Sequence, residues 1–341
     1  MKTFLTTTAL ALGLATAAAA EGELKIYHWF EYIPQELLDK FAAEYDVKVT
    51  MDTFDSNEAL LAALKAGKMG SYDVAVPGDY MVKIMGDEGM LDTFTPDEMP
   101  NLGNIQDQWM DVDFDPGRKS SIPYQWGSTS FSVNTEVYTG PLDSLGLIFD
   151  PPEELKGKIN VLDTSGETLT LASLYAGIPQ CTSDRTQLKA LNDLVQAAKP
   201  YWASFGSDVA KDVLVSGDAA AGMIWSGFSA KARAEGAPIQ YVFPKEGMIV
   251  WMDNVVLLKD APNRDNALKF MNFLLEPENA AAVTNYAAYT SGVKGVEEFL
   301  LPEIANSPES NPPADVKGVF VQACPEEVQV MYDAIWTNLK K

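Results

Sequence analysis

Hydrophobic and polar positions along the chain repeat in two ways, with the two-residue period of a strand or the longer period of an amphipathic helix. Pro34 stands at the favoured first position of a helix that carries Leu37 and Phe41 on its apolar side. Ser56 or Asn57 is placed to cap the next helix. This first series predicts an α/β unit with a largely parallel sheet. Its predicted strands are residues 24–28, 47–54 and 73–76, with helices over 34–45, 57–67 and 80–85.

A second series of the same kind begins after Pro151 and Pro152. Its predicted strands are residues 158–162, 220–225 and 239–243, with helices over 167–177, 184–199 and 228–234. Two long extended segments separate the series, at 122–134 and 249–258, and helices at 263–275 and 278–286 follow the second segment. This order indicates that the chain leaves a first lobe, builds a second lobe and returns.

Two lobes joined by two strands form a hinge, and the cleft between such lobes is a common place for a small-molecule site. We expect lobe one to contain residues 21–126 and 253–290, and lobe two to contain residues 127–252. The C-terminal tail, residues 291–341, is expected to pack back mainly on lobe two. The length of the chain suits two domains of ordinary size.

The N-terminal residues 1–20 have the layout of a cleaved secretory signal. Lys2 is followed by an apolar, Thr-rich stretch that ends in three alanines, Ala18 to Ala20. No cysteine stands at the cleavage site to carry a lipid, so we expect a periplasmic protein that begins at Glu21 and does not insert into a membrane.

Two cysteines, Cys181 and Cys324, are present in the whole chain. In an exported protein such a pair can form a disulfide, whereas in the cytosol it is more often reduced. A bond between them would require the C-terminal tail to return to the region of Cys181.

The chain is strongly acidic, with 48 Asp and Glu residues against 25 Lys and Arg and a net charge of −23. A surface of this kind repels nucleic acid and anionic lipid and favours cationic partners. Solubility alone would also explain the charge. The charge therefore favours a cationic ligand but does not identify it.

Catalytic and metal motifs are nearly absent from the sequence. His28 is the one histidine and lies in a predicted buried strand, where a structural role is expected. Ser291 and Lys294 match S-x-x-K without the K-T-G and S-D-N that accompany it in enzymes. The aspartates at 111, 113 and 115 lack the glycine and glutamate of an EF-hand loop. We therefore expect a binding protein, not an enzyme, with no metal and no cofactor.

Aromatic residues and carboxylates stand together at the ends of predicted strands, where ligands bind in open α/β sheets. Singly, each has a structural explanation, such as core packing for a tryptophan or a helix N-terminus for a glutamate. Together they suit a flexible amine, because flat rings pack on methylenes and carboxylates accept from ammonium groups. The set is Trp29, Glu31, Tyr32, Asp79, Tyr80, Glu167, Trp225, Trp251 and Asp253.

Several short blocks give a further indication of function. They are YHWFEYIP (27–34), SNE (56–58), YDVAVP (72–77), IPYQWG (122–127), GMIW (222–225), PKEG (244–247), WMD (251–253) and FMNFLL (270–275). With these blocks in this order, the chain resembles the periplasmic spermidine/putrescine-binding proteins of polyamine ABC transporters. The resemblance implies a two-lobed type II periplasmic-binding-protein fold with two crossover strands, and delivery of putrescine or spermidine to ABC permease subunits. We expect a monomer.

The resemblance also implies roles for single residues. Aromatic walls would be Trp29, Tyr32, Tyr80, Trp225 and Trp251, and ammonium acceptors would be Glu31, Glu167 and Asp253. It adds Tyr289 and, at a position where some members use glutamine, Gln322.

Two departures from the family pattern leave the preferred polyamine open. Thr164 stands where spermidine-preferring members have a second acid, and Asp79 follows Gly78 where serine and a small residue are common. One carboxylate would thus have moved from lobe two to lobe one. Two alternatives remain, a binder of another amine-bearing molecule and a polyamine-sensing co-receptor for a membrane signalling protein.

Overall fold

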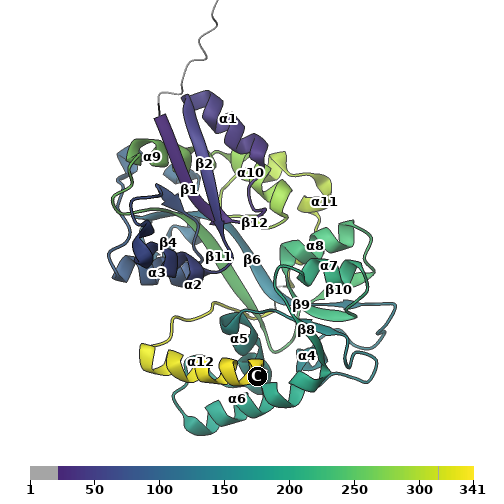
Figure 1. The fold of residues 1–341 in the computed structure, drawn as a ribbon. Coiled ribbons are helices and arrows are strands. Elements are labelled where there is room, and N and C mark those ends of the chain that lie inside the picture. The colour runs from purple at the N-terminus through teal and green to yellow at the C-terminus, as the bar shows by residue number, and fades with distance from the viewer. Residues whose placement is uncertain (1–21, 314) are drawn as a thin grey trace, which may run out of the picture.

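The two long strands predicted from the sequence are the centre of the fold. In the computed structural model, which describes residues 22–313 and 315–341, they are β6 (Ser121–Asn134) and β11 (Met248–Leu257). They pair antiparallel, with Ile249 opposite Thr129 and Val256 opposite Ser121. Figure 1 shows this pair running diagonally between an upper and a lower group of elements. The predicted signal, residues 1–20, lies outside the described residues.

The upper group is built on three parallel strands that join β11 through β3, in the order β2-β1-β3-β11. Its strands are β1 (Gly22–Trp29), β2 (Val47–Phe54) and β3 (Val74–Ala75), and its helices are α1 (Gln35–Tyr45), α2 (Asn57–Ala63), α3 (Asp79–Asp87), α9 (Arg264–Leu274) and α10 (Pro277–Ala287). The short strands β4 (Asp111–Val112) and β5 (Asp115–Pro116) form a separate pair beside it.

Helices cover both faces of the upper sheet, because alternate residues of β1 point to opposite sides. Ile26 packs into a core with Phe41 of α1 and Phe270 of α9. Tyr27 packs on the other face in a core that includes Leu60 of α2 and Met81 of α3. This arrangement confirms the predicted α/β character of the first series.

The lower group continues the same sheet from β6 through β9, β7 and β8, with β10 on the other edge of β6. Its strands are β7 (Ile159–Val161), β8 (Trp202–Phe205), β9 (Ala221–Trp225) and β10 (Ile239–Val242), and its helices are α4 (Gly146–Phe149), α5 (Ser165–Ala176), α6 (Arg185–Ala198), α7 (Ala210–Val215) and α8 (Ser226–Ala234). A single buried cluster forms its core and includes Phe131, Leu191 and Met223.

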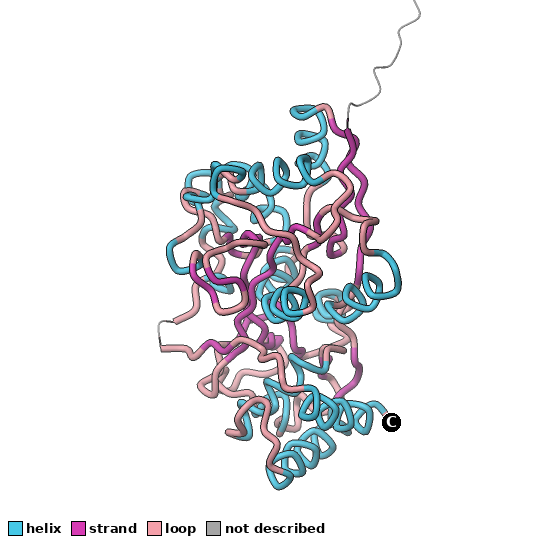
Figure 2. The backbone as a smooth tube through the Cα atoms, turned by 90° about the vertical axis from the view of Figure 1, so that its left-hand side faces the viewer, coloured by secondary structure: helices cyan, strands magenta, loops and turns pink. Residues whose placement is uncertain are grey.

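The C-terminal tail contacts both the central strands and the lower group. Two short strands pair with the central strands, and the last helix packs on α5 and α6 at the lower end of the molecule (Figures 1 and 2). The tail elements are β12 (Thr290–Ser291), α11 (Pro302–Ala305), β13 (Gly318–Val319) and α12 (Glu326–Lys340). The lobe boundaries expected at 126/127 and 252/253 stay a prediction.

A disulfide joins Cys181 to Cys324 and fastens the tail to the loop between α5 and α6. The two cysteines are 143 residues apart in sequence. The pairing that the sequence left open is thus present. Among the described residues, no helix is long and apolar enough to cross a membrane.

Arg118 joins the start of β6 to the last part of β11. Its side chain is fully buried, and Nη1 donates to Ser121 Oγ (3.1 Å) on β6 and to Asn254 Oδ1 (2.7 Å) on β11. Nε donates to the backbone oxygen of Trp109 at 2.6 Å. A guanidinium held by both strands opposes any slip of one strand along the other.

We predict that replacing both cysteines by serine, Cys181→Ser with Cys324→Ser, lowers the free energy of unfolding by about 2–4 kcal/mol. The reason is that the disulfide closes a long loop, and its loss frees the unfolded chain. Urea unfolding measures the change, and wild-type protein reduced with dithiothreitol should reproduce it. Equal midpoints for the variant and the oxidised wild type would contradict the prediction.

Candidate functional site

One face of the β6–β11 pair carries the residues that form the candidate site. Trp251 and Asp253 are two positions apart on β11, so their side chains share a face. The residues directly opposite them on β6 are Gly127 and Gln125, which share that face. Thr129 lies two positions further along, and its Oγ1 accepts a hydrogen bond from Trp251 Nε1 at 3.0 Å.

An aromatic cluster covers this face from the upper group. The ring of Tyr289, which follows α10, lies nearly perpendicular to Trp251 at 5.0 Å and to Tyr32 at 5.6 Å between centroids. The Tyr32 hydroxyl donates to Asp253 Oδ2 at 2.9 Å. Gly127 permits this packing, because a Cβ there would lie 2.7 Å from Cζ2 of Trp251.

Glu167 approaches the same face from the lower group, near the start of α5. Its Oε1 accepts from Thr129 Oγ1 (2.5 Å) and Trp225 Nε1 (2.9 Å), and its Oε2 accepts from Thr164 Oγ1 (2.8 Å). Hydrogen bonds therefore run from Trp251 through the Thr129 hydroxyl to Glu167. Thr164 donates to the carboxylate and adds no charge of its own.

Asp79 differs from the other acids because backbone groups hold both of its oxygens. Oδ1 accepts from Tyr80 N at 2.6 Å and Oδ2 accepts from Met252 N at 2.8 Å, so the side chain ties the start of α3 to β11. Its side chain is buried. The Tyr80 hydroxyl donates to Glu58 Oε1 at 2.9 Å.

Asp79 is buried and Asp253 and Glu167 are half-buried, and this loss of contact with water disfavours their charged forms. Burial, with the charges of Asp79 and Glu167, raises the pKa of Asp253 from 3.8 to about 8. Burial raises the pKa of Asp79 to about 7, although hydrogen bonds from backbone N–H groups oppose this. Burial also raises the pKa of Glu167 against the three hydrogen bonds that it accepts. A cation placed among these acids would favour their ionised forms.

Three predicted site residues make no hydrogen bond to Asp253, Asp79 or Glu167 in the described structure. Trp29, at the end of β1, packs on Phe54 at 4.5 Å between centroids. Glu31 is exposed, has a left-handed backbone (φ 50°) and acts electrostatically on Lys231. Gln322 is exposed on the tail, and its backbone N–H donates to a glutamine side chain beside the disulfide. Their roles toward a ligand stay predictions.

Two residues of the site were missed at the sequence level, Thr129 and Glu58. Gln125, Gly127 and Thr129 occupy alternate positions of β6 and share one face. This two-residue period was the available signal that Thr129 faces the same side as the IPYQWG residues Gln125 and Gly127. Glu58 lies in the SNE block at the start of α2 and offered no signal that separates it from an ordinary first-turn acid.

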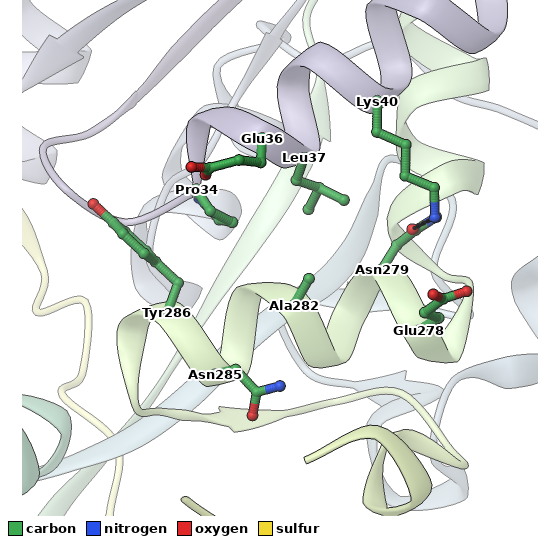
Figure 3. Close-up of a pocket in the computed structure, with 9 residues that line it drawn as sticks. All are labelled: Pro34, Glu36, Leu37, Lys40, Glu278, Asn279, Ala282, Asn285 and Tyr286. Carbon is green, nitrogen blue, oxygen red and sulfur yellow. Dashed lines mark hydrogen bonds between the residues drawn. The ribbon is translucent and has the colours of Figure 1, made fainter. Parts of the chain in front are cut away.

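A surface groove of about 440 Å³ lies elsewhere, between α1 and α10 (Figure 3). Lys40 crosses it to donate to Asn279 Oδ1 at 2.7 Å, and its acids Glu36 and Glu278 are exposed. Exposed acids are hydrated, and salt screens their charges. The groove is therefore a weaker cation site than the face that carries Asp253 and Glu167. Within residues 22–313 and 315–341, no cluster of His, Cys, Asp or Glu is suited to a metal ion.

Comparison with known proteins gives consistent matches over the chain. A family model described as bacterial extracellular solute-binding protein matches residues 36–313. The spermidine/putrescine-binding periplasmic protein of Salmonella typhimurium is 33% identical, covering 97% of this chain and 96% of its own. Its counterpart in Escherichia coli is 36% identical, covering 90% and 88%. A solved spermidine/putrescine ABC transporter substrate-binding protein from Streptococcus pneumoniae is 28% identical with a TM-score of 0.81, covering 94% and 99%.

We predict that the free energy of unfolding of the ligand-free protein falls as pH rises from about 4 to about 8. Asp253 and Asp79 have raised pKa values when folded, so the folded state holds protons that the unfolded state has released in this window. Urea unfolding at intervals of one pH unit measures the slope.

Asp253→Asn should flatten that slope by up to about 1.4 kcal/mol per pH unit, because the proton held by Asp253 no longer contributes. Asp208→Asn, at an exposed position, is the matched control and should leave the slope unchanged. A slope that is the same in all three proteins would contradict the assignment of raised pKa values to the site.

Proposed function

The chain belongs to the bacterial extracellular solute-binding proteins, and we propose that it captures a polyamine, putrescine or spermidine, in the periplasm and delivers it to an ABC permease. Relatives named as spermidine/putrescine-binding cover nearly the whole chain at 33–36% identity. The fold is the two-lobed type II fold of periplasmic binding proteins, as the sequence predicted. The family carries substrates for transport.

The observation that carries the proposal is the pairing of aromatic rings with half-buried acids on one face of the β6–β11 pair. Trp251 is half-buried and offers a flat apolar surface on which methylenes can pack, and Tyr289 packs against its ring. Asp253 and Glu167 provide carboxylates at two places along the same face. An ammonium group that leaves water loses favourable interactions, and a carboxylate and an aromatic ring beside it replace many of them.

We propose that the upper group is lobe one, residues 21–126 and 253–290, and the lower group is lobe two, residues 127–252. The tail, residues 291–341, packs mainly on lobe two, as the position of α12 on α5 and α6 supports. Trp29, Tyr32, Tyr80 and Trp225 complete the aromatic walls in this proposal, with Glu31, Asp79 and Gln322 at the margins.

A protein of this kind works as a monomer, with one ligand held per cleft, and it performs no chemical step on the ligand. A polyamine-sensing role would use the same cleft but a different membrane partner. Reconstitution with the permease in proteoliposomes separates the two, since a transport protein stimulates polyamine-dependent ATP hydrolysis there.

Calorimetry with putrescine, cadaverine, spermidine and spermine tests the ligand. We predict binding of at least one of them, and a loss of affinity of tenfold or more in both Asp253→Asn and Trp251→Ala. The first variant removes a half-buried carboxylate and the second removes an aromatic wall, so each takes away an interaction that replaces the water lost by the ammonium group.

Glu36→Gln, in the groove between α1 and α10, is the matched acid-to-amide control and should bind as the wild type does. Loss of binding in this control with normal binding by Asp253→Asn would move the site to the groove. Failure of all four polyamines to bind would contradict the proposed ligand class.

A further inference from the structure

Gln125 has a fully buried side chain that finds no hydrogen-bond partner in the described part of the chain. It lies on β6 with 0% of its surface exposed. Among the residues that the structure describes, neither its Oε1 nor its Nε2 has a hydrogen-bond partner. Buried amides are nearly always hydrogen-bonded, because an unmet donor or acceptor destabilises the fold. A position that keeps such a group at that cost calls for a functional explanation.

The strand register places Gln125 on the binding face. It lies directly opposite Asp253 in the antiparallel ladder, and directly opposed residues share a face of the sheet. Two positions along β6, Gly127 lies opposite Trp251 on that same face. On its other edge, Gln125 lies opposite Ser291 of β12, two residues after Tyr289. The amide is therefore surrounded by the strands that present the site.

We propose that Gln125 Oε1 accepts a hydrogen bond from the ammonium group that Asp253 binds, which makes Gln125 a specificity-determining residue for a primary ammonium end. This inference rests on the proposed function and adds a residue to its site. Asp253 Oδ2 already accepts from the Tyr32 hydroxyl, so a second acceptor is useful to a group with three N–H donors.

A neutral amide suits this position better than another acid. Asp79 and Glu167 already raise the pKa of Asp253 through their negative charges, and a fourth carboxylate would add to that repulsion. The amide offers an acceptor to the ligand without a charge. It therefore improves ammonium binding without weakening the ionisation of Asp253.

The chemistry predicts which ligands Gln125 distinguishes. A primary ammonium end has three N–H donors, whereas an N,N-dimethylated end has one. With two acceptors in place, the primary end uses donors that the dimethylated end lacks. We expect the wild type to bind putrescine at least tenfold more tightly than N,N-dimethylputrescine.

The test is Gln125→Met, which keeps the length of the side chain and removes its polar atoms. We expect the affinity for putrescine and spermidine, measured by calorimetry, to fall tenfold or more, and the preference for the primary end to shrink. The melting temperature of the ligand-free variant should stay the same or rise, because an unpartnered amide is gone. A merely structural glutamine would give the opposite pattern, a lower melting temperature with unchanged affinity.

Gln106→Met is the matched control, since Nε2 of Gln106 donates to the backbone oxygens of Ser291 and Val293. It should lower the melting temperature and leave polyamine affinity unchanged. Gln125→Asn is a second variant that withdraws the amide by one methylene and keeps its polarity. It should also weaken binding, and it guards against poor folding of the methionine variant.

The outcomes separate this inference from the proposed function. Wild type that binds no polyamine would overturn both. Wild type that binds, with both Gln125 variants within twofold of its affinity and its preference for primary ends, would overturn the role of Gln125 alone.

Discussion

The antiparallel pairing of β6 with β11 is the constraint on which the rest of the structure depends. Side chains alternate along a strand, so a slip by one residue would turn Trp251 and Asp253 to the opposite face. Several contacts oppose such a slip. Arg118 bonds both strands, Asp79 accepts from Met252 N, and Asn254 N donates to the backbone oxygen of Pro77. The same pair also carries the sheet from one lobe into the other, so the register of the site and the connection of the lobes are one feature.

The binding face sets stability against function. Gathering Asp253, Asp79 and Glu167 away from water makes their ionised forms unfavourable. Burying Gln125 leaves an amide that has no hydrogen-bond partner among the described residues. A core chosen for stability alone would contain none of these groups. The rest of the protein compensates with well-packed apolar cores in both groups and with the disulfide that fastens the tail. A cationic ligand supplies the charges that the acids lack.

Sequence patterns predicted the elements better than their contacts. The strands at 122–134 and 249–258 were found almost to the residue because long extended segments without helical period leave little choice. The helix α12 was not predicted, although its buried residues Val328, Tyr332, Ile335 and Leu339 repeat with helical spacing and offered a signal. Tyr32, Asp253 and Tyr289 were named from the sequence, and the structure brings them together. Thr129 was missed because its only signal was strand periodicity, which every residue of a strand shares. Gln322 lies beside the disulfide because of long-range packing of the tail, and a local sequence pattern carries no information on such packing.

Gly127 limits how this protein could evolve. Any side chain there would push a Cβ to within 2.7 Å of the Trp251 ring and 3.0 Å of Ser226 Oγ. A substitution at 127 would therefore need a simultaneous change on β11, and such paired changes arise rarely. Changes in ligand preference among descendants of this chain should therefore arise at the acids and amides around the rings. The contact between Trp251 and Gly127 of β6 should stay the same.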